Sequence, residues 1–190
     1  MDAVTATAQM TAAEFLALPE DETGRRWELI DGELVMSEPS WTHSDSQGCV
    51  YSALRQWIAG DRGSGAVGLP LDVRFGERDV YCPDVVWYRE ARAPERGDQA
   101  PYPVPDLAVE VRSPSTWRYD VGVKKANYER HGVAELWLID TAADVVIVFR
   151  RAAPAAPDFD VSVELGADEA LTSPLLPGFS LAVAEIFAAG

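Results

Sequence analysis

The segment Leu107-Ala108-Val109-Glu110-Val111-Arg112 is a short apolar run with one carboxylate inside it. Its length and its aliphatic residues predict a β-strand. Because successive side chains of a strand point to opposite faces, the Leu and Val side chains share one face, and Glu110 shares the other with Arg112. The strand therefore presents an acid and a guanidinium together. A surface ion pair is the simplest interpretation of these two residues taken alone.

The surrounding sequence predicts an α/β domain with a mixed β-sheet flanked by α-helices. Asp31-Gly32 joins two apolar stretches and supplies the positive φ angles of a two-residue hairpin turn. After the 107–112 strand, a helix over 120–131 and a further strand give a βαβ-like unit. We expect a tail over 1–10 and one domain over 11–190. The other predicted elements are helices at 11–18, 43–59 and near 187, strands at 26–30, 33–37, 66–69, 71–75, 84–88, 135–139 and 145–150, and a proline-rich loop over 89–105.

The composition limits the classes of partner. The chain has 190 residues and a formal net charge of −15, which disfavours broad non-specific binding to nucleic acid. Between Arg112 and His131, five basic and two acidic side chains reverse that balance to a local charge of +3. Cys49 and Cys82 have neither disulfide-framework nor zinc-site spacing. With no long apolar run and no basic leader, we expect a cytoplasmic protein that contacts no membrane.

A second carboxylate, Asp84, follows Pro83 where a strand emerges from a turn. Alone it is typical of a turn aspartate. If its strand neighbours the 107–112 strand, Asp84 and Glu110 converge and offer hard oxygen ligands suited to Mg²⁺ or Mn²⁺. The helix that begins near Asp120 can then direct Lys124 at the same end of the sheet.

This order of residues resembles the PD-(D/E)xK restriction-endonuclease-like superfamily, with one altered position. Arg112 stands where the simplest form of the motif has lysine, and Lys124 matches a lysine that has migrated to the following helix. More closely, the chain is similar to the Uma-type endonucleases. The matching segments are Trp27 to Leu34, Pro83-Asp84, Val109 to Thr116, Asp120 to Tyr128, Gly132 to Trp137 and Ser173 to Phe179.

The resemblance implies a restriction-endonuclease-like fold and a role for each matching residue. Asp84 and Glu110 would bind the metal, with the Val111 carbonyl as a third ligand, and Lys124 would hold or deprotonate the attacking water. Glu28 is either a further metal carboxylate or a strand-surface residue.

Other residues near these motifs have simpler structural interpretations beside the functional ones. Arg112 would clamp a phosphate or form a salt bridge across the sheet. Lys125 and Arg118 supply the basic segment that would contact nucleic acid, and His43 would orient a phosphate or water or act structurally. Asp120 is expected to cap its helix and pair with Lys124. Tyr128 and Trp137 lie in apolar-periodic segments and are expected in the core.

Three functions are consistent with these features. The first is a metal-dependent phosphodiesterase, a DNA endonuclease that leaves a 5′-phosphate if the superfamily pattern holds. The second is a catalytically weak or inactive module of the same fold that binds nucleic acid or protein. The third is a toxin-like or mobile-element factor whose partner supplies DNA affinity. A homodimer is also expected as a way to cut two strands.

Overall fold

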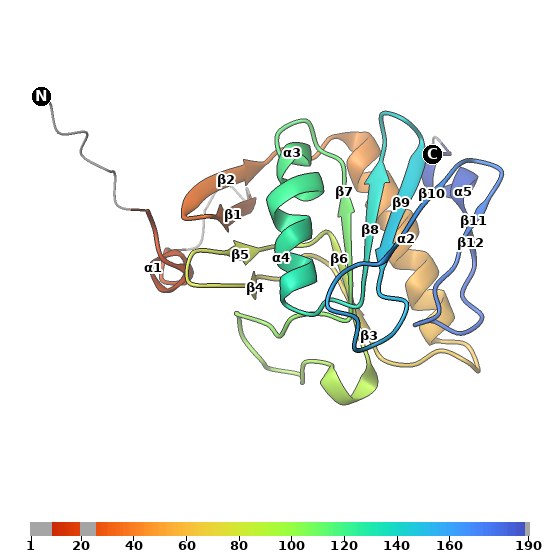
Figure 1. Cartoon of the computed structure of the whole chain (residues 1–190), viewed down its shortest axis with the longest axis horizontal. Coiled ribbons are helices and arrows are strands. Elements are labelled where there is room, and N and C mark those ends of the chain that lie inside the picture. Colours follow the sequence, from red (N-terminus) through yellow and green to blue (C-terminus); the bar gives the residue numbers. More distant parts are fainter. Residues whose placement is uncertain (1–8, 20–25, 189–190) are drawn as a thin grey trace, which may run out of the picture.

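The computed structural model describes residues 9–19 and 26–188, and its strands in these ranges form three sheets (Figure 1). The largest is six-stranded in the order β10-β9-β8-β7-β6-β3, a four-stranded sheet has the order β2-β1-β5-β4, and β11 pairs with β12. The strands are β1 (Arg26–Ile30), β2 (Glu33–Ser37), β3 (Ala66–Gly68), β4 (Val73–Arg74), β5 (Val80–Tyr81), β6 (Val85–Tyr88), β7 (Leu107–Val111), β8 (Glu135–Asp140), β9 (Val145–Arg150), β10 (Val161–Leu165), β11 (Ala170–Leu171) and β12 (Leu181–Ala182). The helical segments are α1 (Ala12–Leu16), α2 (Trp41–Ile58), the 3-10 turn η1 (Glu90–Arg92), α3 (Trp117–Tyr119), the π-helical turn η2 (Asp120–Lys124), α4 (Lys125–Arg130) and α5 (Val183–Phe187).

Helices cover both faces of the six-stranded sheet. Val50 and Leu54 of α2 pack with Val109 of β7, whereas Tyr128 of α4 packs with Ala108 of the same strand. Because neighbouring residues of a strand point to opposite faces, α2 and α4 lie on opposite sides, as Figure 1 also shows. Glu110 has the same parity as Ala108, so its side chain lies on the α4 side. The predicted alternation along 107–112 is therefore confirmed.

The β7–α4–β8 unit provides the parallel strand pair of the six-stranded sheet. β7 and β8 are parallel, and every other pairing in this sheet is antiparallel. A parallel pair needs a crossover connection, which the α3–η2–α4 segment supplies. The expected mixed sheet with flanking helices is thus confirmed. An extended loop precedes β7. Arg92 in this loop donates a 2.6 Å hydrogen bond to the buried Asp106 and so fixes the loop next to the strand.

The local turn signals are also confirmed. Asp31 and Gly32 have φ angles of 47° and 79° between the paired strands β1 and β2. Thr11 and Glu14 form the capping box that starts α1. Most of the expected 1–10 tail lies outside the described residues. Helix α2 begins at Trp41, two residues before His43, because the Ser40 hydroxyl accepts the backbone N–H of His43 and caps the helix there.

The helix predicted to start at Asp120 differs in the structure. Helical backbone already begins at Trp117, and Asp120 opens the π-helical turn inside the helical segment. Asp120 therefore does not cap the start of a helix, contrary to expectation, whereas its expected pairing with Lys124 is confirmed. The wider π turn directs both Asp120 and Lys124 into the protein, where each is buried. In the described part of the chain, none of the helices combines the length and the apolar character that a bilayer crossing requires.

Candidate active site

Asp84 and Glu110 meet at one end of the large sheet. β6 and β7 are antiparallel neighbours with Val85 opposite Val109, so the residue before β6 stands opposite Glu110. The Oδ2 atom of Asp84 accepts the backbone N–H of Val111 at 2.7 Å. This bond fixes the Asp84 carboxylate against β7. The predicted convergence of the two strands is confirmed.

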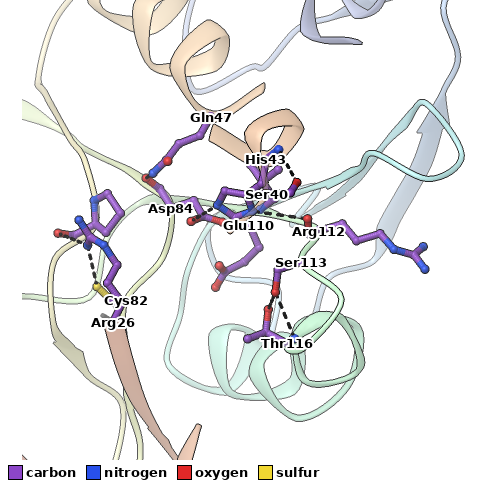
Figure 2. A network of polar contacts seen from close by, with 12 residues as sticks. Arg26, Ser40, His43, Gln47, Cys82, Asp84, Glu110, Arg112, Ser113 and Thr116 are labelled. Atoms are coloured by element: carbon purple, nitrogen blue, oxygen red, sulfur yellow. Dashed lines mark hydrogen bonds and ion pairs between the residues drawn. The ribbon is translucent and has the colours of Figure 1, made fainter. Parts of the chain in front are cut away.

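Helix α2 holds Asp84 from the other side of the sheet. His43 Nε2 lies 3.1 Å from Asp84 Oδ1, and Gln47 donates to the Asp84 carbonyl at 2.8 Å. Figure 2 shows His43 and Asp84 facing each other beside Glu110. Burial lowers the pKa of His43, but the hydrogen bond and the charge of Asp84 outweigh burial and raise it. His43 thus lies in the site as a buried partner of Asp84, and its role toward a substrate stays a prediction.

Glu110 is almost fully enclosed, with 3% of its surface exposed. The Tyr128 hydroxyl of α4 donates a hydrogen bond to its Oε1 atom. Burial raises the pKa of Glu110 well above its usual value, the charges of neighbouring carboxylates add to the rise, and Lys124 opposes it. The hydrogen bond from Tyr128 therefore holds the carboxyl group in one position. The positive charge of Lys124 does not fully offset the effects of burial and of the neighbouring acids on its pKa.

Lys124 lies among three carboxylates. Its Nζ atom is 2.9 Å from Glu28 Oε1, 2.8 Å from Glu110 Oε1 and 2.9 Å from Asp120 Oδ1. Burial lowers the pKa of Lys124, but the charges of these three acids outweigh it and hold the pKa well above its usual value. A base that deprotonates water at neutral pH requires the opposite shift. In this arrangement Lys124 is an ammonium group that donates hydrogen bonds.

Glu28 faces the site from the small sheet. Its Oε1 atom accepts the backbone N–H of Cys82 at 2.7 Å as well as the Lys124 ammonium. Glu28 is buried, so the surface interpretation of this residue is wrong. Glu28, Asp84, Glu110 and Lys124 line a cavity of about 20 Å³, together with Arg26, Ser37, His43, Cys82 and Thr116. That space is enough for one water molecule or one ion.

The residues around the cavity suit a divalent cation. Three carboxyl groups contact the Lys124 ammonium, those of Glu28, Glu110 and Asp120, and the Asp84 carboxylate lines the same cavity. These four acids outnumber the lysine and arginine side chains at the cavity, Lys124 and Arg26. In residues 9–19 and 26–188, no three His, Cys, Asp or Glu side chains are already arranged around a common ion position. Mg²⁺ commonly takes one or two protein carboxylates and completes its shell with water and phosphate oxygens. Glu28, Asp84 and Glu110 are the carboxylates of this cavity that could hold Mg²⁺ or Mn²⁺.

Three predicted substrate-binding side chains lie outside this cavity. Arg112 points away from the group in Figure 2, and its Nη1 atom lies 2.9 and 3.0 Å from the two oxygens of Asp140. Lys125 Nζ lies 4.6 Å from the centre of the Phe149 ring, and Arg118 donates to the Tyr119 hydroxyl. The structure thus gives Arg112 the salt bridge that was its alternative interpretation. Arg118 and Lys125 are not brought to the carboxylates.

Several residues of the site were missed or given another role from the sequence. Tyr128 was assigned to the core; it is there, and it also bonds Glu110. Asp120 contacts Lys124 as expected, and it also accepts the Thr116 hydroxyl at 3.1 Å, which was not predicted. Arg26 borders the cavity and was not considered. Its position two residues before Glu28 is the signal that could have found it, since alternate strand residues share a face.

The sheet topology and the carboxylates at the ends of two neighbouring strands define a restriction-endonuclease-like α/β protein. Residues 12–184 match the Uma2 family, described as "Putative restriction endonuclease", and the chain belongs to this family. This confirms the resemblance found in the sequence. None of the curated proteins matches the chain.

Two solved structures are similar to this chain. A putative nuclease of the family DUF820 from Anabaena variabilis superposes with a TM-score of 0.76 at 25% identity, over 94% of this chain and 98% of the other. The type IIG restriction endonuclease BpuSI gives a TM-score of 0.41 at 17% identity, over 80% of this chain and 16% of that protein. The second value is too low to support an argument. The first confirms a nuclease-like fold over nearly the whole length of both chains.

Proposed function

We propose that this protein is a metal-dependent phosphodiesterase that cleaves DNA as an endonuclease. The observation that carries the proposal is the convergence of Asp84, Glu110, Glu28 and Lys124 on one small cavity. Membership of a family described as restriction endonucleases supports nucleic acid as the substrate class. Mg²⁺ or Mn²⁺, when bound, would polarise the scissile phosphate and supply an activated water.

The chain's own residues would then position the cation and the attacking water and stabilise the negative charge that develops on the phosphate. Asp84 and Glu110 would hold the cation. The Val111 N–H and His43 fix Asp84, and Tyr128 fixes Glu110. In place of one of its three carboxylate contacts, Lys124 would donate from its ammonium group to the attacking water or to a phosphate oxygen, where negative charge develops in the transition state. Its high pKa favours this donor role over proton abstraction.

Cleavage assays test the proposal directly. The purified protein is incubated with single-stranded and double-stranded DNA and with RNA in Mg²⁺, Mn²⁺ or EDTA. We expect DNA cleavage in either metal, none in EDTA, and a loss of at least about 100-fold for Glu110→Gln, which removes a charged ligand but keeps the hydrogen-bond acceptor. Asp140→Asn is the matched control, since that carboxylate lies outside the cavity. Equal cleavage by wild type and Glu110→Gln would contradict the proposed site.

A binding module with weak or no cleavage is the second candidate. Lys124 is fully engaged with three acids, and the chain has a net charge of −15. Both features disfavour a phosphate in the cavity unless a cation enters with it. If the wild type binds nucleic acid but cleaves none of these substrates in either metal, this second function replaces the first. Dimerisation stays a prediction that light scattering on the protein alone and with DNA can test.

A further inference from the structure

A second, much larger cavity adjoins the candidate active site. Its volume is about 660 Å³, and Arg26 and Cys82 line both cavities. Its other walls come from helix α1, the β1–β2 hairpin, the 70–72 segment and the loop at 100–102. Volumes of this order are typical of sites for small organic molecules. A molecule in the large cavity would therefore lie directly beside the carboxylates.

Most of the side chains that line the large cavity are apolar or aromatic. Trp27 and Leu34 share one face of the hairpin, because Leu34 stands opposite Leu29 and Trp27 is two residues from Leu29. Trp27 has 37% and Leu34 43% of its surface exposed, and Phe15, Leu71 and Tyr102 also line the space. Flat apolar walls with aromatic rings suit a nucleobase, which stacks on such side chains without sequence preference.

Arg26 supplies the positive charge at the junction of the two cavities. Within residues 9–19 and 26–188, its guanidinium makes long contacts, 3.4 Å to the Pro70 carbonyl and 3.5 Å to the Cys82 sulfur. Figure 2 shows Arg26 against Cys82, next to the Asp84 group. Among the lining residues that the structure describes, Asp72 is the one acid; burial raises its pKa, and the charge of Arg26 opposes that rise. An exposed guanidinium beside an apolar cavity suits a phosphate joined to a base.

We propose that the large cavity binds the unpaired nucleoside that flanks the scissile phosphate, with Arg26 on the phosphate between the two cavities. The proposal rests on the function proposed above and extends it. A base can enter a cavity only when it has left its partner, so the protein acts on single-stranded DNA or on duplex positions whose base is displaced. The preferred substrate is thus unpaired DNA rather than perfect duplex.

The test measures binding and cleavage separately. Fluorescence anisotropy in Ca²⁺ gives the affinity for a labelled single-stranded oligonucleotide, the same oligonucleotide with abasic sites, and the perfect duplex. We expect the single strand to bind at least about tenfold more tightly than either of the other two. Trp27→Ala and Leu34→Glu should each weaken binding of the single strand about tenfold or more, and Arg26→Gln by a similar factor with a smaller salt dependence.

Matched controls separate the cavity from general effects. Trp41→Ala removes a tryptophan with 81% of its surface exposed, and Arg74→Gln removes an exposed arginine; neither residue lines the two cavities, so both should bind as the wild type does. Leu34→Glu changes an exposed side chain, so it keeps the test valid if Trp27→Ala fails to fold. Cavity variants that bind like the controls would overturn the nucleoside site, as would equal affinity for abasic and intact strands. Wild-type cleavage in Mg²⁺ is measured in parallel. If the wild type cleaves DNA but the cavity variants bind normally, the nucleoside site is wrong and the endonuclease function is retained.

Discussion

Nζ of Lys124 and Oε1 of Glu110 are 2.8 Å apart, and these residues have only 1% and 3% of their surface exposed. A buried ion pair of this kind does not by itself stabilise a fold, because desolvation of the two charges offsets their attraction. The loss of one partner is costly, however, since it leaves the other charge buried alone. Lys124 is the shared partner of three acids, so the stability of the site depends on it.

Lys124→Met is expected to destabilise the protein by about 3–5 kcal/mol at neutral pH. The pKa of Lys124 is raised, so in the wild type its stabilisation is present at every pH below the ordinary lysine pKa. Burial raises the pKa of Glu110 and of Asp120, and Lys124 opposes both rises, so without the ammonium these two pKa values rise further. The destabilisation then shrinks as pH falls through these raised values, because the acids take up protons. Urea unfolding at about pH 8 and about pH 5 measures this difference.

Lys125→Met is the control for that measurement. Lys125 is the adjacent lysine, half-exposed over the Phe149 ring, and it contacts none of the four acids. Its replacement should change the free energy of unfolding by about 1 kcal/mol or less, equally at both pH values. If Lys124→Met is no less stable than Lys125→Met at the higher pH, burial of the three carboxylates in charged form does not depend on Lys124.

Divalent cations are expected to raise the melting temperature. At a Mn²⁺ concentration of about 100 times Kd, binding to the folded state adds about 2.7 kcal/mol, which corresponds to about 5–10 °C for a chain of this size. Asp84→Asn and Glu110→Gln should each lose most of that shift, whereas Asp140→Asn should keep it. Differential scanning calorimetry with and without Mn²⁺ gives the comparison. An identical shift in all four proteins would place the ion elsewhere.

Local signals in the sequence predicted much of the framework. The Asp31-Gly32 turn, the capping box at Thr11 and the alternation along β7 each depend on a few adjacent residues, and each is present in the structure. β5, β11 and β12 were not predicted, because strands of two residues have no periodicity to detect. β10 was also missed, although Val161 to Leu165 alternates apolar and polar residues and so carries the period-two signal of a strand.

The site was predictable only in part, for a different reason. Asp84 and Glu110 follow from the pairing of two strands, and the contact of Lys124 with Asp120 follows from their spacing of four residues. The contact of Lys124 with Glu28 on β1 depends on tertiary packing, which no local signal reveals. A regular helix opening at Asp120 was the expectation, so the inward direction of Asp120 could not be seen. The position of Arg112 likewise depends on Asp140, at the end of β8.

The Arg112–Asp140 pair is expected to contribute to stability rather than to cleavage. Arg112 is partly exposed, so a double-mutant cycle of Arg112→Met and Asp140→Asn should give a coupling of about 0.5–1 kcal/mol. Cleavage by either variant should stay within about threefold of wild type, because neither side chain lines the cavity. A large rise in KM for Arg112→Met that Asp140→Asn does not share would instead assign Arg112 to the substrate.

Tyr128→Phe isolates the hydrogen bond that holds Glu110. Tyr128 is fully buried, and burial, together with the nearby carboxylates, raises the pKa of its hydroxyl, which therefore stays a donor across the working pH range. Its removal should cost about 1–2 kcal/mol of stability, the loss of one buried hydrogen bond. Without this hydrogen bond Glu110 is less firmly positioned, so the Mn²⁺ concentration needed for half-maximal cleavage should rise and kcat should fall. The product of these two changes should be about tenfold or more.

Tyr88→Phe is the matched control, since Tyr88 is equally buried and its hydroxyl donates to the Pro103 carbonyl instead. Both variants should lose similar stability, but only Tyr128→Phe should shift the Mn²⁺ dependence of cleavage. Metal titrations of single-turnover rates, with urea unfolding of the same samples, separate positioning of Glu110 from general loosening of the core. If the two variants cleave with the same Mn²⁺ dependence, Tyr128 only packs the core, and Glu110 is positioned by Lys124 and the sheet alone.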